Sequence, residues 1–232
     1  MGLAHGTNIV KDGLVFLTDP ANPRSYPGSG TIITDLKEKQ SGTLSSTNMF
    51  DESESRTIAF DNSNFINFGH DSSLNFGTGE FTVLCWVGGL PSYPGSASTI
   101  IWKGGRFDGN RAGWNIAWAN SPQDAYFIIS SASSRREGRT NPNGGLNGWS
   151  GFKMIGMQRS GTNWNQIVDT AVTTLGTFSG NVDNTEDLLI AKNGQYNSYL
   201  NANIGPVLIY NRALSAQEVK QNYNALKGRF GL

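Results

Sequence analysis

The sequence predicts an all-β sandwich, and three features of its composition and pattern lead to that fold class. Short apolar runs alternate with turns rich in Gly, Asn, Ser and Pro along most of the 232 residues. Charged residues make up only 16% of the chain, below the roughly 25% of an average globular protein. The chain also holds 29 glycines, which suit tight turns. We therefore expect one β domain over residues 1–232.

About a dozen runs have the length and residue types of strands. They are Gly13–Asp19, Thr31–Leu36, Thr57–Phe60, Phe65–Phe68, Glu80–Val87, Ser98–Lys103, Gly113–Ala119, Ala125–Ser130, Phe152–Arg159, Trp164–Asp169, Asp187–Ala191 and Ile204–Tyr210. In Glu80–Val87 both alternating faces are largely apolar, so this strand should be central and covered on each side. Three polar segments are expected to be long loops: Asp51–Arg56, Pro91–Ser98 and Ser131–Gly151.

One amphipathic helix is predicted near the C-terminus, at about 215–227. Ser215 and Glu218 have the spacing of a capping box, and Gly228 is expected to end the helix. The residues that recur at helical spacing are Val219, Tyr223 and Leu226. Because a short helix that ends a β chain must bury its apolar stripe, we expect these side chains to pack on the sandwich.

Charge and cysteine usage exclude several classes of partner. Eighteen basic and eighteen acidic side chains give a formal net charge of zero, which disfavours nucleic acid and anionic membranes. The single cysteine, Cys85, lies in an apolar run and should be a buried small hydrophobe rather than half of a disulfide. Neither a secretory signal nor a membrane-spanning stretch is visible. We expect synthesis in a cytoplasm, followed by retention or assembly there.

Five segments in order carry a family resemblance over nearly the whole chain. They are GLVFLTDPANPRSYPGSG, TIITDL, IAFDNSNFINFG, LNFGTGEFTVLCWV and IGPVLIYNRALSAQEVKQNYNALKGRF. These segments resemble the laminin-G-like, concanavalin A-like family, which implies a jelly-roll β-sandwich closed by a final strand and a helix. The version of the loop at Asn22–Gly28 is similar to that of virion proteins of tailed bacteriophages, especially marine ones. That likeness implies capsid decoration or a place in a fibre.

The resemblance also implies a calcium site, although the fold requires no cofactor. The implied ligands are Asp61, Asn62 and Asn64 in the turn FDNSNF, with Asp19 after the first strand. In the family's pattern this turn carries a second carboxylate, where the present chain has an amide. Ca²⁺ takes several oxygen ligands with carboxylates among them, so this departure weakens the implied site.

The residues give no constellation for catalysis. Paired carboxylates on one strand, which glycosidases need, are absent from the pattern, since Glu52 and Glu54 lie in the polar stretch DESESR. The two histidines, His5 and His70, are not placed as the base of a triad. We therefore expect a protein that is not an enzyme.

Two tryptophans allow two interpretations. Trp114 and Trp118 share one face of the run GWNIAWA, and Asn115 lies on the other. Exposed rings flanked by amides would form a sugar-binding platform, whereas buried rings would line the core between the sheets. Core packing is the favoured interpretation for such large side chains.

Three functions from different classes follow. The first is a virion structural protein, located in the virion, that contacts capsid or fibre proteins and other copies of itself. Arg135, Arg136 and Arg139 are its predicted interface residues, within a loop. The alternative is a lectin-like module that binds a glycan through Trp114, Asn115 and Trp118 with or without calcium. The third is a glycoside hydrolase or lyase of the same fold.

Overall fold

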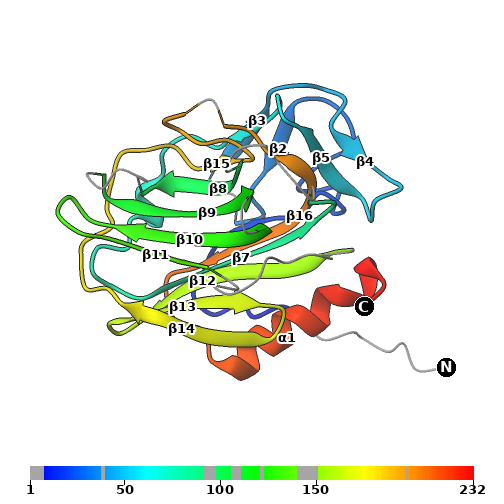
Figure 1. Cartoon of the computed structure of the whole chain (residues 1–232). Helices are drawn as coiled ribbons and strands as arrows, with labels where there is room; N and C mark the ends of the chain where they lie inside the picture. The colour runs from blue at the N-terminus through cyan, green and yellow to red at the C-terminus, as the bar shows by residue number, and fades with distance from the viewer. Residues whose placement is uncertain are drawn as a thin grey trace.

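The computed structural model describes residues 8–37, 40–90, 98–105, 111–120, 123–139, 151–196 and 198–232. Two antiparallel eight-stranded sheets face each other, and one helix lies against the outer face of one of them (Figure 1). The predicted all-β sandwich with a C-terminal helix is thereby confirmed. No helix of the described residues is long and apolar enough to cross a membrane.

The first sheet, called sheet A, has the order β14-β13-β12-β7-β16-β5-β4, with β1 also paired to β16. Its strands are β1 (Leu14–Thr18), β4 (Phe50–Asp51), β5 (Thr57–Asp61), β7 (Phe81–Gly88), β12 (Lys153–Ser160), β13 (Asn163–Val168), β14 (Ala171–Thr177) and β16 (Asn201–Tyr210). The second, sheet B, has the order β11-β10-β9-β8-β15-β6-β3-β2. Its strands are β2 (Ile32–Thr34), β3 (Ser41–Leu44), β6 (Ile66–Asn67), β8 (Ser98–Gly104), β9 (Gly113–Asn120), β10 (Gln123–Ser130), β11 (Arg135–Arg139) and β15 (Leu189–Ile190). A 3₁₀ turn, η1 (Ser72–Leu74), precedes β7.

Each predicted strand is present, but four further strands were missed. They are β3, β4, β11 and β14. Strand β11 lies within the predicted loop Ser131–Gly151, and β4 includes the first residue, Asp51, of the predicted loop Asp51–Arg56, which corrects those two predictions. Both are edge strands with much of their surface in solvent, so neither shows the apolar alternation of a half-buried strand.

Strand β7 occupies the centre of sheet A, as its sequence predicts, and all of its residues are buried. Phe81, Val83 and Cys85 point into the core between the sheets. Leu84 and Trp86 point to the opposite side and belong to the cluster beneath the helix. Burial raises the pKa of the Cys85 thiol, which fits its predicted role as a small core side chain.

The helix α1 (Ala216–Leu226) begins at the predicted capping box. Ser215 Oγ accepts from the Glu218 N–H at 3.2 Å, and the Glu218 carboxylate accepts from the Ser215 N–H at 2.8 Å. The end differs from the prediction. The chain runs on through a 3₁₀ turn, η2 (Lys227–Phe230), and the left-handed residue is Gly231 with φ 72° rather than Gly228.

The helix packs on sheet A through a mixture of apolar and polar side chains. Val219 is fully buried, while Tyr223 and Leu226 are half-buried against the same cluster. The Tyr223 ring stacks on Trp86 with 5.5 Å between ring centroids. Asn222, which the apolar periodicity did not single out, is also fully buried.

Asn222 acts as a buried hydrogen-bond acceptor between three parts of the chain. Its Oδ1 accepts from the Val10 backbone N–H at 2.8 Å and from the Tyr210 hydroxyl at 3.3 Å. The Tyr210 hydroxyl in turn donates to the Val10 carbonyl at 3.0 Å. These bonds fasten the segment before β1 and the end of β16 to the helix.

We predict that Asn222→Ala lowers the free energy of unfolding by about 1–3 kcal/mol, because the buried Val10 N–H loses its acceptor, whereas the Tyr210 hydroxyl keeps the Val10 carbonyl. Chemical denaturation monitored by circular dichroism measures the change. Asn224→Ala is the matched control, since Asn224 lies on the exposed side of the same helix. Equal stability of the two variants would contradict the role assigned to Asn222.

Candidate functional site

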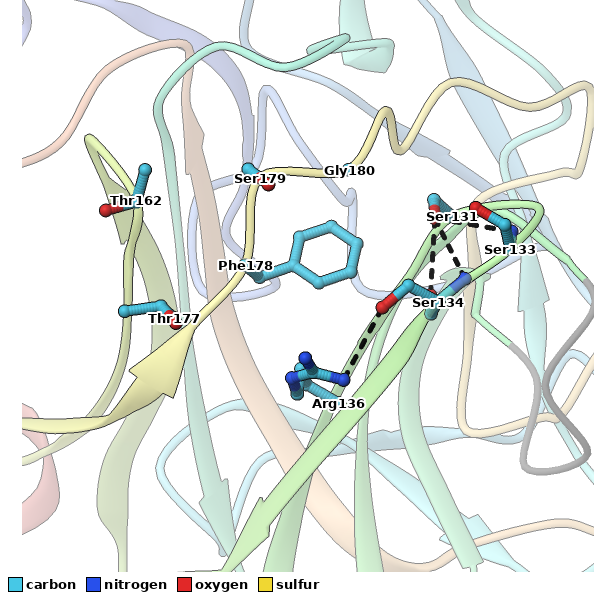
Figure 2. Close-up of a pocket in the computed structure, with 9 residues that line it drawn as sticks. All are labelled: Ser131, Ser133, Ser134, Arg136, Thr162, Thr177, Phe178, Ser179 and Gly180. Atoms are coloured by element: carbon cyan, nitrogen blue, oxygen red, sulfur yellow. Dashed lines mark hydrogen bonds between the residues drawn. The ribbon is translucent and has the colours of Figure 1, made fainter.

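The candidate site is a pocket at the rim of the sandwich, with a volume of about 430 Å³ (Figure 2). We call it the rim pocket. Its lining consists of Ser131, Ser133, Ser134, Arg136, Thr162, Thr177, Phe178, Ser179 and Gly180. These residues come from the turn between β10 and β11 with the start of β11, from the turn between β12 and β13, and from the end of β14 with the segment that follows it. The volume falls within the roughly 300–1,000 Å³ of small-molecule sites.

One wall of the pocket is the turn Ser131–Ser134, called the serine turn. The Ser131 N–H donates to the Ser134 carbonyl at 2.7 Å, and the Ser134 N–H donates back to Ser131 Oγ at 3.1 Å. Such side chain-to-backbone bonds allow serines to close a tight turn. The turn is therefore ordered before any ligand arrives.

The opposite wall is the segment after β14, and Figure 2 shows the Phe178 ring directed from it toward the serine turn. The Phe178 N–H donates to the Thr162 carbonyl at 2.8 Å. Gly180 makes a close approach: a Cβ there would lie 2.7 Å from both Phe178 Cζ and Ser131 Cβ. Only glycine fits at this point without pushing the two walls apart.

A fully buried arginine, Arg159 at the end of β12, anchors this wall. Its guanidinium donates to three carbonyl oxygens: Gly79 at 2.6 Å, Gly77 at 2.8 Å and Gly180 at 2.8 Å. Burial lowers the pKa of Arg159, and the three carbonyl oxygens accept hydrogen bonds from its guanidinium. Sequence reasoning missed this role of Arg159, because its three acceptors are backbone carbonyls, which no side-chain pattern indicates.

Four hydroxyl groups of the lining are free to bind a ligand. They belong to Ser133, Thr162, Thr177 and Ser179. Within the described part of the chain, none of these side chains donates or accepts a hydrogen bond. A concave surface of unpaired hydroxyls beside an aromatic ring and a guanidinium suits a ligand that itself carries many hydroxyl or oxyanion groups.

The three arginines predicted at an interface lie on β11 and not in a loop, which corrects that expectation. Arg135 forms an ion pair with Glu137 on the same strand. The Arg139 guanidinium lies 4.2 Å from the centroid of the Tyr126 ring. Arg136 differs from both, because it lines the rim pocket. Residues 91–97 and 140–150 of the predicted association loops lie outside the described residues.

The predicted sugar-binding tryptophans are in the core. Trp114 and Trp118 are 0% and 1% exposed and belong to the cluster between the sheets. Their rings therefore form no exposed platform, and the core interpretation describes them correctly. Asn115 on the other face of β9 is also fully buried, with its Nδ2 donating to the Gly104 carbonyl at 3.3 Å and to that of Gly105.

The predicted calcium ligands have different partners in the structure. Asp19 forms an ion pair with Arg229, at 2.6 Å between Oδ1 and Nη1. Asp61 Oδ1 accepts from Asn64 Nδ2 at 2.8 Å, within a turn where Asn62 has φ 69°. Among the described residues no group of three or more His, Cys, Asp or Glu side chains could hold a metal ion. Calcium binding stays a prediction. Because Asp19 is paired with Arg229, Asp61 is the carboxylate ligand on which that prediction depends.

A second hollow of about 370 Å³ adjoins the rim pocket and shares three lining residues with it. The shared residues are Ser131, Ser133 and Gly180. Asn181 and Asp183 line only the second hollow, whereas Arg136 lines only the rim pocket. The Asp183 carboxylate and the Arg136 guanidinium therefore belong to different hollows, with the serine turn between them. The Asp183 carboxylate accepts from the Gly77 N–H, which ties the segment to the turn before β7.

A buried lysine, Lys103 of β8, holds the continuation of the same segment. Its Nζ donates to Asn184 Oδ1 at 3.0 Å and to the Glu186 carbonyl at 2.7 Å, and lies 3.3 Å from His70 Nδ1. Burial lowers the pKa of Lys103 to about 8, against the raising effect of the acids around it. His70 thus adjoins an ammonium group rather than a nucleophile, and His5 lies outside the described residues.

Comparison with known proteins gives a family and a set of folds. A family model described as the concanavalin A-like lectin/glucanases superfamily, Laminin_G_3, matches residues 60–220. No curated protein matches the chain by sequence. Among solved structures, the binding domain of botulinum neurotoxin DC in complex with SialylT matches at TM-score 0.70 and 10% identity, over 93% of this chain and 52% of that one.

Two further structures share the fold. The binding domain of Paraclostridial Mosquitocidal Protein 1 has TM-score 0.66 and 15% identity, over 91% of this chain and 52% of that one. Trypanosoma rangeli sialidase in complex with the inhibitor DANA has TM-score 0.64 and 11% identity, over 96% of this chain and 34% of that one. The chain thus spans about half the length of these structures or less, and the likeness concerns the fold alone.

We predict that the contribution of Lys103 to stability, measured as the difference between wild type and Lys103→Met, rises with pH between about 8 and 10.5. Its pKa in the folded protein is about 8, below the ordinary value of 10.5, so the unfolded chain binds more protons in that window. Below about pH 8 both states are protonated and the contribution is flat. Urea denaturation at a series of pH values measures the slope.

Lys103→Met should remove that contribution to the slope, whereas the same change at Lys153, whose Nζ lies 3.0 Å from the Asp169 carboxylate at the surface, should leave it unchanged. Parallel pH profiles for wild type and Lys103→Met would show that the lysine does not titrate in this window.

Proposed function

Because the chain belongs to the concanavalin A-like lectin/glucanases superfamily, we propose that it is a non-enzymatic binding domain that holds a glycan in the rim pocket. The observation that carries the proposal is a set of four hydroxyls in one cavity that have no hydrogen-bond partner among the described residues. Sugars offer hydroxyls at every carbon of the ring, and paired donors and acceptors give such sites their specificity. The fold family supports the same ligand class.

The lining favours binding over catalysis. Its nine residues are of five types: Ser, Thr, Arg, Phe and Gly. None of these types is a usual general acid or base in enzymes. Hydrolysis of a glycosidic bond ordinarily uses two carboxyl groups on either side of that bond. Asp183 lines the adjoining hollow without a second carboxylate in that lining. A glycosidase or lyase is therefore the weaker proposal for this pocket.

The neighbours in fold agree with a binding role without establishing it. Two of them are binding domains of toxins, and one is described in complex with SialylT. The third is a sialidase bound to an inhibitor. Since identity is at most 15% in these three, only the chemistry of this chain's own pocket can argue for its ligand.

We predict that Thr162→Val, Thr177→Val and Ser179→Ala together weaken glycan binding at least about tenfold. Each lost hydrogen bond contributes roughly 0.5–1.5 kcal/mol, and 1.4 kcal/mol is a factor of ten in Kd. Screening on a glycan array finds the ligand, and calorimetric titration measures Kd. The melting temperature should not change, because these hydroxyls bond to nothing within the described chain.

Thr173→Val is the control for this experiment, because Thr173 is exposed on the same strand β14 but outside the lining. Full affinity in the triple variant would move the site away from the rim pocket. If wild type binds no sugar on the array, the proposed function is wrong.

A second function that we propose is a structural role on a tailed-phage virion, as capsid decoration or fibre component. The sequence feature that favours it is the loop Asn22–Gly28, which resembles the version in such virion proteins. In the structure this loop is a compact turn: the Tyr26 hydroxyl donates to the Gly30 carbonyl at 2.8 Å, and Ser25 Oγ donates to the Thr34 carbonyl at 2.7 Å. A glycan site on a virion would be compatible with this role.

Mass spectrometry of purified particles from the host that carries this gene would test the virion role. The chain should be present in intact virions at stoichiometric amounts, in contact with capsid or fibre proteins or with further copies of itself. Its absence from intact particles would leave the glycan-binding proposal to stand alone.

A further inference from the structure

We propose that the rim pocket selects an acidic glycan, and that Arg136 binds the anionic group of the sugar. This inference deepens the proposed function and rests on it. It follows from the position of Arg136 within β11, from the atoms of its guanidinium that remain free, and from the distribution of carboxylates around the pocket.

Strand alternation directs Arg136 away from the other charges of its strand. Arg136 pairs with Ile129 in the antiparallel register of β10 and β11, and Gly138 pairs with Phe127. Ile129 and Phe127 lie in the core between the sheets, and residues directly opposite share a face. Arg136 therefore lies on the inner face of sheet B at its edge. Its neighbours 135, 137 and 139 lie on the outer face.

The two sheets approach each other at this edge, so the exposed Arg136 side chain lies beside the rim pocket that it lines. A Cβ on Gly138 would lie 2.6 Å from Leu175 Cδ1, and Leu175 belongs to β14 of the opposite sheet. Thr177 and Phe178 follow directly and form the facing wall of the pocket. In Figure 2 the Arg136 guanidinium lies between the serine turn and this wall.

The Arg136 guanidinium is held at one nitrogen and free at the others. Nη1 donates to the Arg135 carbonyl at 3.0 Å and is 3.5 Å from Ser134 Oγ. Within the described residues no other partner exists, and no carboxylate pairs with it. Nε and Nη2 lie along one edge of the planar group and can bind both oxygens of a carboxylate, or two of a sulfate.

The charges nearby would orient an acidic sugar. No carboxylate lines the rim pocket, and Glu137 is already paired with Arg135 on the outer face of β11. Asp183 lies in the adjoining hollow, past the serine turn. A negative group would be attracted at the Arg136 end and repelled at the Asp183 end. The free hydroxyls of Ser133 and Ser179 are left for the neutral part of the ring.

The test compares oligosaccharides that differ only in charge. Calorimetric titration uses galacturonate oligomers, the same oligomers with their carboxyl groups reduced to alcohols, and a sulfated galactan of equal length. Wild type should bind an acidic oligomer at least about tenfold more tightly than the neutral one. The preference should shrink as salt rises from about 50 to 500 mM, because a partly exposed charge pair is screened.

Arg136→Gln should abolish this preference, measured as the ratio of the affinities for the acidic and the neutral oligomer. Arg136→Lys should restore only part of it, since an ammonium group lacks the planar fork. Arg139→Gln is the matched control: it removes an equal charge from the same strand, on the opposite face, and should keep the preference. A stronger response to sulfate than to uronate would support the inference and identify the anion.

Failure of the inference can be told apart from failure of the proposed function. Equal binding of neutral and acidic oligomers by wild type, unchanged in Arg136→Gln, would overturn acidic selectivity and leave a neutral glycan site. An equal loss of preference in Arg139→Gln would show that net charge, and not Arg136, attracts the ligand. Binding of no oligomer at all, charged or neutral, would overturn both.

Discussion

The structure depends on one constraint: strand β7 is apolar on both faces and must be covered on both. One face packs against sheet B, which closes the main core around Phe81, Val83 and Cys85. The other face, with Trp86, requires a second cover, and the amphipathic helix α1 supplies it. The C-terminal helix is thus a third layer that completes the sandwich, and its capping box and the buried Oδ1 of Asn222 fasten it to the rest of the chain.

With both faces of the central strands used for packing, polar chemistry is left to the rim. There the segment after β14 crosses from one sheet to the other and needs anchors of its own. Two buried cations provide them, Arg159 through the Gly180 carbonyl and Lys103 through Asn184. In the described part of the chain, both cations donate to neutral oxygens and neither bonds a carboxylate. Burying them in this way costs desolvation energy, but it restricts the geometry of the segment. The walls of the rim pocket are held in place by these bonds.

A preformed, hydroxyl-rich pocket on a rigid scaffold is suited to recognition, since little entropy is lost when the ligand binds. The same arrangement explains why a binding function needs few conspicuous residues. Serines and threonines are common in loops, and only their shared orientation toward one cavity distinguishes them. Arg136 acquires its distinct role in the same way, because strand geometry separates it from Glu137 one residue along the chain.

The sequence by itself determined the fold class, most strands, the central position of Glu80–Val87, and the capping box at Ser215, because each depends on local periodicity or on residues a few positions apart. The sequence did not predict the edge strand β11, because edge strands carry no clear apolar pattern. It also did not predict that the left-handed residue after the helix is Gly231, because helix ends depend on local packing. Only the tertiary structure decided the site. It brings together residues from three separate segments between Ser131 and Gly180, and a buried arginine binds the Gly180 carbonyl beside them. No local sequence pattern predicts that these segments meet.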